Sequence, residues 1–193
     1  MKQFLESKEL LRTVTEESKQ VNEEAKQLVG SLNETQLNWK PAPERWSIAQ
    51  CLDHLRVSSE GYNNYLPNAI GRGREKWPTS GAVSYHPTLM GGWLIKQLLP
   101  ENTRKIPAPK IFRPAASSSI HDSLNNFLKQ QEVFLNFVNN ANGFDYNKAR
   151  LRSPVTPLVR YSVADTFVLI VVHNRRHLAQ ALRVKQDPNF PNS

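Results

Sequence analysis

The chain has 193 residues, enough for a sizeable core, and we expect residues 1–193 to form a single domain. An apolar fraction of 39% excludes a disordered chain. No apolar run approaches the roughly 20 residues that cross a membrane, so we expect no membrane partner. The amino terminus carries glutamates and lacks the features of a secretory signal, and the one cysteine excludes an internal disulfide. Both observations favour a cytoplasmic protein.

The net charge of +8 and the pI of about 9.7 raise the question of nucleic acid. The basic residues are scattered, with modest clusters at Arg72-Arg74-Lys76 and Arg104-Lys105. The sequence contains no basic helix, RNA-binding aromatic motif or paired Cys/His finger spacing. We therefore expect no nucleic-acid partner; a nucleic-acid binder would show a steep salt dependence of its DNA affinity.

The first predicted helix covers residues 2–32, where apolar residues recur at steps of three and four. This spacing is typical of a helix in a bundle. Pro41 and Pro43 forbid a regular helix in the segment that follows. Trp39 and Trp46 stand on either side of these prolines, and we expect them to pack this loop over one end of the bundle.

The second predicted helix covers residues 47–70 and begins with a capping box formed by Ser47 and Gln50. Residues 71–116 are rich in glycine and proline and read as loops, with one short helix within 87–99. Connections of this length are uncommon in compact domains unless they are functional or cross from one end to the other. We expect a crossover along the bundle.

The third predicted helix begins near Ser119 and ends shortly before Gly143. The fourth covers residues 162–184, with Ser162 and Asp165 as a capping-box-like pair. Four long amphipathic helices without convincing strands predict an all-α protein. The predicted fold is a four-helix bundle with a long crossover connection between the second and third long helices.

Three histidines are candidates for a metal site. His173 and His177 lie four residues apart in the fourth helix, so their side chains are neighbours. Their buried nitrogens need partners, which either ordinary hydrogen bonds or a divalent metal would supply. His54 lies on an inward-leaning ridge of the second helix and would complete a three-histidine site with an open position. Such a site suits one divalent transition metal: imidazole ligands accept zinc, nickel, copper or iron, and the sequence does not choose among them. Zinc and nickel are our first candidates.

Other polar residues could take part in chemistry. Asn174 stands where the zinc-protease motif HExxH has its glutamate, so protease chemistry by that route is not expected. Asp53 should point away from His54, toward the surface. His86 could approach the metal, and His121 reads as a surface residue. Cys51 lies one turn before His54, and we interpret it as a small core residue. No catalytic residue is assigned.

Further residues near the histidines have simple structural interpretations. Arg175 and Arg176 either neutralise an anionic substrate or are solvated or paired on the exterior, which we favour. Tyr62 and Tyr65 have helical spacing and are interpreted as core residues rather than the lining of a pocket. Gln180 lies close to one turn beyond His177 and could orient that ligand through a hydrogen bond.

Two stretches of the chain resemble the DinB-like, or DinB/YfiT-like, metalloenzymes. These are WSIAQCLDHL (residues 46–55) and, about 120 residues later, HNRRHLAQALRV (173–184). The segment QLNWKPAPERW (36–46) has the same likeness. The resemblance implies a four-helix bundle with a divalent metal held by the histidines. The matching residues are Trp46, Ser47, His54, His173, His177, Leu178 and Gln180.

The resemblance implies less about activity than about fold. Characterised relatives include transferases and isomerases that use a thiol such as bacillithiol, mycothiol or glutathione, and others are described as metal-dependent hydrolases. Relatives are often dimers, so a homodimer is one expectation. Our first hypothesis is a metalloenzyme that activates a thiol or water for transfer or hydrolysis on a small molecule. The alternative is a non-catalytic metal-binding or stress-related interaction protein with the same bundle.

Overall fold

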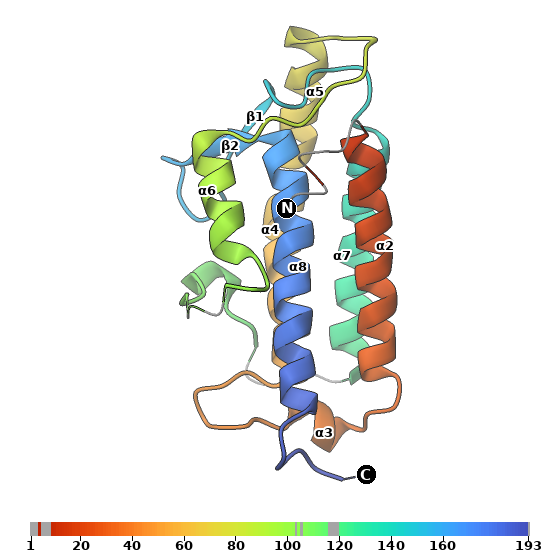
Figure 1. Ribbon diagram of the computed structural model, residues 1–193, viewed down its shortest axis with the longest axis vertical. Coiled ribbons are helices and arrows are strands. Elements are labelled where there is room, and N and C mark those ends of the chain that lie inside the picture. The colour runs from red at the N-terminus through yellow and green to blue at the C-terminus, as the bar shows by residue number, and fades with distance from the viewer. Residues whose placement is uncertain (1–3, 5–8, 103, 105, 116–119, 193) are drawn as a thin grey trace.

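The computed structural model describes residues 4, 9–102, 104, 106–115 and 120–192, with the side chains of residues 120 and 121 left out (Figure 1). It is mostly helical, with one short β-ribbon before the last helix. In chain order the elements are α2 (Leu10–Val29), α3 (Glu34–Asn38), α4 (Ile48–Asn63), α5 (Leu66–Lys76), α6 (Leu89–Leu98), the 3₁₀ turn η1 (Lys110–Phe112), α7 (Ile120–Asn139), β1 (Arg150–Arg152), β2 (Arg160–Ser162) and α8 (Val163–Lys185).

Four long helices form a bundle, in which α2 and α4 each pack against both α7 and α8 (Figure 1). The predicted all-α four-helix bundle is confirmed. The connection between α4–α5 and α7 is long, as predicted, and its helix α6 packs against α8. Among the described residues, no helix is both long and apolar enough to cross a membrane.

The second helix differs from its prediction over residues 47–70. It consists of α4 and α5, which are separated at Asn64 and Tyr65. Pro67 lies in the first turn of α5, where its missing N–H is tolerated, but it cannot continue α4. The helix then runs to Lys76, so the prediction of a loop from residue 71 was wrong. Position 73 favours glycine, because the ring of Phe144 occupies the space that a Cβ would need.

The third and fourth long helices agree closely with their predicted bounds. The first was predicted too long, because Glu9 is not helical and residues 30–32 follow the end of α2, and α3 lies in a segment that was predicted as a loop. Of the predicted helix 2–32, the structure places α2 at Leu10–Val29, and residues 2, 3 and 5–8 lie outside the described part. Ser119, the predicted start of the third helix, also lies outside it. Gly143 follows α7 with a φ of +81°, a conformation that only glycine adopts without strain.

A two-stranded antiparallel ribbon, β1 and β2, lies just before α8 and was not predicted. Strands of three residues are too short to show the alternation of a longer strand. The register pairs Leu151 with Tyr161, and both side chains are buried. The neighbouring arginines on each strand are exposed.

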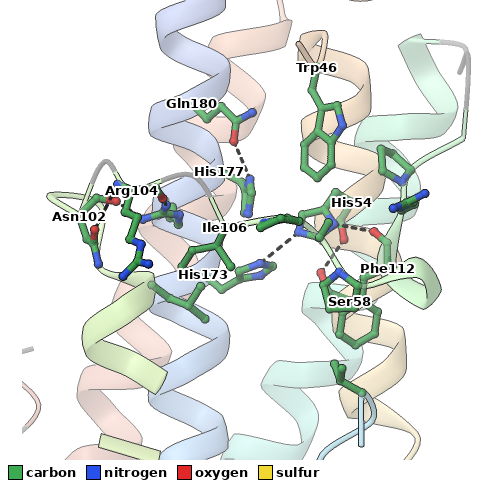
Figure 2. A pocket seen from close by; sticks show the side chains of 18 of the residues that line it. Trp46, His54, Ser58, Asn102, Arg104, Ile106, Phe112, His173, His177 and Gln180 are labelled. Atoms are coloured by element: carbon green, nitrogen blue, oxygen red, sulfur yellow. Dashed lines mark hydrogen bonds between the residues drawn. The ribbon is translucent and has the colours of Figure 1, made fainter. Parts of the chain in front are cut away.

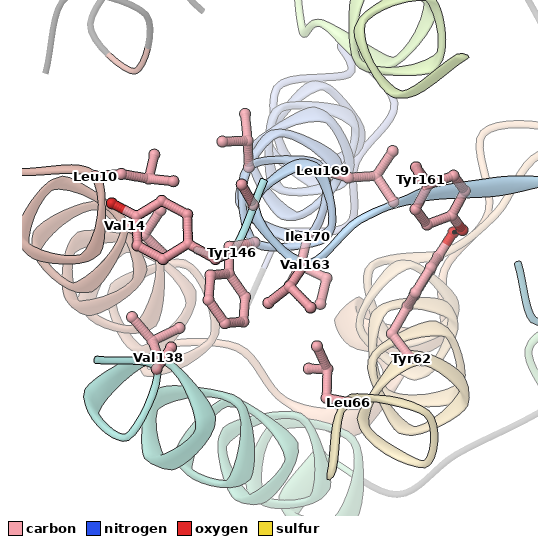
Figure 3. Close-up of a cluster of buried hydrophobic side chains, with 14 of the residues drawn as sticks. Leu10, Val14, Tyr62, Leu66, Val138, Tyr146, Tyr161, Val163, Leu169 and Ile170 are labelled. Carbon is pink, nitrogen blue, oxygen red and sulfur yellow. Dashed lines mark hydrogen bonds between the residues drawn. The ribbon is translucent and has the colours of Figure 1, made fainter. Parts of the chain in front are cut away.

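The apolar core divides into two clusters along the bundle. One cluster includes Phe134 and Phe167, together with Tyr161 and the other side chains labelled in Figure 3. The second includes Leu52 and Phe127 and lies nearer α3. On α8 the first cluster ends at Val172 and the second begins at Leu178, so the histidine segment falls between them. This arrangement places a polar layer across the middle of the bundle.

Asp165 joins the crossover connection to the start of α8. With Ser162 it forms the predicted capping box. Its carboxylate also accepts hydrogen bonds from the Tyr85 hydroxyl at 2.9 Å and the Thr88 hydroxyl at 2.7 Å. Gly91 allows this approach, because a Cβ there would lie 2.3 Å from the carboxylate. One buried side chain therefore fixes where α6 meets the bundle.

We expect Asp165→Ala to lower the free energy of unfolding by about 2–4 kcal/mol, because one half of the capping box is lost and the hydroxyls of Tyr85 and Thr88 lose their buried acceptor. Urea unfolding of the variant and the wild type would measure this loss. Glu132→Ala, which removes an exposed carboxylate on α7, is the control and should change stability by less than about 0.5 kcal/mol. A loss as small as the control's would contradict the anchoring of the crossover by Asp165.

Candidate metal centre

The three predicted histidines come together in the middle of the bundle (Figure 2). His54 lies on α4, while His173 and His177 lie one turn apart on α8. One ring nitrogen from each lies within 4.8 Å of the other two. His54 Nε2 and His173 Nε2 are 3.1 Å apart. Side chains from two facing helices thus converge on one point.

Hydrogen bonds on the far side of two rings fix their tautomers. His54 Nδ1 lies 2.6 Å from the carbonyl oxygen of Phe112, and His177 Nδ1 lies 3.0 Å from Gln180 Oε1 (Figure 2). Oxygen can only accept in these bonds, so each Nδ1 carries the hydrogen. The Nε2 lone pairs of His54 and His177 are therefore free to face the centre. Gln180 orients His177 as the sequence predicted.

All three imidazoles are held neutral near pH 7. Burial lowers the pKa of His54, and burial together with the other two histidines lowers that of His173 well below its ordinary value. Burial, reinforced by the neighbouring His54, lowers the pKa of His177 to about 3. Metal ligands must be unprotonated, so the environment favours the form that coordinates.

Trp46 covers the histidines on the side of the proline-rich loop. Its ring centroid lies 4.7 Å from that of His54 and 5.7 Å from that of His177 (Figure 2). Trp39 instead packs edge-on against Phe190 near the end of the chain. The two tryptophans thus hold the loop against the bundle, and Trp46 also shields the histidine centre from one side.

A cavity of about 1190 Å³ opens onto the three histidines. One wall comes from α6 and the residues that follow it, including Trp93, Leu98 and Ile106. Arginines outnumber carboxylates among its lining residues, so the field in the cavity favours an anion. The charged lining residues are Arg45, Arg104, Arg113, Arg176 and Arg183, with Glu44 and Asp187.

The two arginines between the histidines have different surroundings. Arg175 pairs with Glu17 at 2.6 Å and Glu24 at 3.2 Å on α2, as favoured from the sequence. Arg176 lines the cavity, which that interpretation missed. It donates to the backbone carbonyls of Leu99 at 3.0 Å, Arg104 at 2.8 Å and Asn102. Arg176 therefore holds the segment after α6 against the cavity.

Asp53 is buried, so its predicted position on the surface was wrong. It pairs with Arg56 at 2.8 Å and accepts a hydrogen bond from the backbone N–H of Ala115 at 2.7 Å. The α4 backbone does turn Asp53 away from His54, but the returning crossover covers that face. The Asn174 side chain donates a hydrogen bond to Gln131 at 3.0 Å inside the bundle. It therefore has a structural role and does not replace the general base of the zinc-protease motif.

The remaining candidates lie away from the histidines or serve the core. His86 is exposed and does not line the cavity. The side chain of His121 lies outside the described residues. Tyr62 is buried, bonded to the Tyr161 hydroxyl at 2.9 Å, and also reaches the cavity wall. Tyr65 is 43% exposed at the break between α4 and α5, so its predicted place in the core was wrong.

Sequence reasoning missed the contribution of the crossover to this centre. The carbonyl of Phe112 orients His54, but any residue type supplies a backbone carbonyl, so no sequence signal marks it. The only available signal was the unusual length of the connection, which is typical of functional loops.

Cys51 is fully buried among apolar side chains, and burial raises the pKa of its thiol to about 12. We expect Ellman's reagent to leave the folded protein unmodified at pH 8 and to label one thiol per chain in guanidinium chloride, because the thiolate is the reactive form. Rapid labelling of the folded chain would contradict the interpretation of Cys51 as a core residue.

Comparisons with known proteins agree with this geometry. No curated protein matches the sequence significantly. Among solved structures, YfiT from Bacillus subtilis, a "probable metal-dependent hydrolase with an unusual four-helix bundle topology", is similar with a TM-score of 0.59. The match covers 93% of this chain and 88% of YfiT at 15% identity, which shows a shared fold. The DinB superfamily pattern matches residues 18–181, which include all three histidines, and the chain therefore belongs to the DinB superfamily.

Proposed function

We propose that His54, His173 and His177 hold one divalent transition-metal ion, with zinc or nickel as the first candidates. The convergence of three neutral imidazoles at the base of a large cavity carries this proposal. Imidazole nitrogens suit both metals, and three protein ligands leave a position open to water or substrate.

The hydrogen bonds around the rings favour a metal over simple core histidines. Without a cation, the Nε2–H of His173 can donate to His54 Nε2 at 3.1 Å. The same hydrogen cannot also serve His177 Nε2 well. Among the described contacts, His177 Nε2 has no hydrogen-bond donor. A cation at the centre would give all three lone pairs a partner, while the bonds to Phe112 and Gln180 hold the rings in place.

We propose that the protein catalyses hydrolysis or thiol transfer on a small anionic molecule. A bound ion would lower the pKa of coordinated water or of a low-molecular-weight thiol and so supply a nucleophile near neutral pH. The chain would contribute the apolar walls from α6, the cover of Trp46 and the arginines that attract the anion. YfiT, described as a probable metal-dependent hydrolase, is consistent with this chemistry.

Within the described part of the chain, no carboxylate contacts the histidines as a general base would. Among the described residues, none of the three imidazoles bonds to an aspartate or glutamate. The lining carboxylates Glu44 and Asp187 belong to the proline-rich loop and the segment after α8. Proton removal from water or thiol would therefore depend on the lowered pKa of the coordinated group.

We expect elemental analysis of the untagged protein to find about one equivalent of zinc or nickel per chain. His173→Ala and His177→Ala should each lose the metal, because the two imidazoles that remain would bind it too weakly to retain it during purification. Gln180→Ala should keep the fold and bind the same metal roughly 10–100-fold more weakly. Gln186→Ala, an exposed neighbour on the same end of α8, is the control. Wild-type protein without metal, even after incubation with several ions, would contradict the site.

Turnover tests the enzymatic part of the proposal. We expect the metal-loaded protein to hydrolyse an activated anionic ester, or to couple a thiol to an anionic electrophile such as 4-chloro-3,5-dinitrobenzoate with release of chloride. His54→Ala should reduce either rate to background, whereas Cys51→Ala, which removes a buried thiol without a place in the cavity, should retain it. A bound metal without turnover in either assay would favour the non-catalytic alternative.

A further inference from the structure

A second pocket, of about 330 Å³, lies between the end of α5 and the ribbon. Both elements stand at the end of the bundle away from α3 (Figure 1). Five of its seven lining residues are cationic, and no carboxylate lines it. It includes two residues of the basic sequence cluster at 72–76, which the metal centre does not use. The lining residues are Arg72, Lys76, Trp77, Arg150, Leu151, Arg152 and Arg160.

The register of the ribbon gathers three arginines on its outer face. Leu151 and Tyr161 face each other in the core, so Arg150 and Arg152 share the opposite face of β1. Arg160 lies directly across from Arg152. Like charges in directly opposed positions of an antiparallel pair are destabilising. The buried pair fixes this register, since a slip of one residue would turn the arginines into the core.

The helix α5 adds two cations to the same pocket. Arg72 and Lys76 are four residues apart, so they lie on one face of the helix with like charges that repel. The Arg72 guanidinium donates to the backbone carbonyl of Arg150 at 3.4 Å, which leaves its charge unneutralised. Helix and ribbon thus bring together five positive groups from three segments.

These cations differ from three arginines elsewhere in the protein that pair with carboxylates. Arg12, Arg56 and Arg175 each form ion pairs with a glutamate or aspartate. None of the five pocket cations forms an ion pair among the residues that the structure describes. All five side chains are exposed to solvent, and their concentration in one concave site without a carboxylate attracts an anion from outside the chain.

We propose that this pocket binds the phosphate groups of a small ligand that carries two or more phosphates. Guanidinium groups match phosphate oxygens in a two-pronged geometry, and several such groups at one site favour a multiply charged anion over a single phosphate. A concave site of this size holds a small molecule. The pocket shares no lining residue with the histidine cavity, so the proposal stands independently of the metal.

Isothermal titration of the full chain with inorganic triphosphate at 150 mM salt tests this proposal. We expect one binding site per chain and at least tenfold weaker binding of monophosphate. The double substitution Arg152→Gln/Arg160→Gln should weaken triphosphate binding at least tenfold. It should not lower the melting temperature of the free protein, because it removes a repulsion and leaves the buried Leu151–Tyr161 pair intact.

Matched variants separate the pocket from general charge and from the metal centre. Lys19→Gln/Lys129→Gln makes the same change in net charge at exposed sites on α2 and α7 and should leave binding unchanged. Triphosphate can also chelate a metal, so binding at the histidine centre needs its own control. His173→Ala should bind triphosphate like the wild type, because the two pockets share no lining residue.

Three results would overturn the proposal. Equal losses in both double variants would show attraction by net charge alone. Loss of binding in His173→Ala, or in Arg113→Gln/Arg183→Gln, would place the anion in the histidine cavity. Tighter binding of a single-stranded oligonucleotide than of triphosphate, with the same dependence on Arg152 and Arg160, would identify a nucleic acid as the occupant.

Discussion

The arrangement of three neutral imidazoles inside a helix bundle is the constraint on which the rest of the structure depends. Polar groups withdrawn from water are costly unless each finds a partner. Here the outer nitrogens of His54 and His177 find theirs in a loop carbonyl and in Gln180, so their inner nitrogens face His173. The polar layer continues through Asn174, which donates to Gln131 on α7. The two apolar clusters on either side of this layer supply the packing that holds it in place.

The crossover connection turns this polar layer into a site that a small molecule can enter. At one end, Asp165 fixes the start of α6 through bonds to Tyr85 and Thr88. Farther along, Arg176 binds three backbone carbonyls, and Asp53 receives the N–H of Ala115. The bundle thus holds the connection at several points, and the space left between them is the cavity. Rigid helices position the imidazole nitrogens, while the connection sets the shape and charge around them.

The positive charge of the chain is distributed with more order in space than along the sequence. Arginines that are scattered in the sequence gather around the histidine cavity, and a separate group gathers where α5 meets the ribbon. Three other arginines, Arg12, Arg56 and Arg175, pair with carboxylates. Part of the net charge of +8 is therefore concentrated at these two pockets.

The sequence by itself determined the four long helices, the capping boxes at Ser47 and Ser162, and the three histidines that meet. Helical periodicity and caps are local signals. They also predict which side chains of each helix face the inside of the bundle before the packing of the helices is known. Only the tertiary structure decided that Asp53 is buried and that the Phe112 carbonyl orients His54. The ribbon and the basic pocket beside it also required the tertiary structure. These features depend on where segments distant in sequence come to lie, and no local pattern encodes that contact.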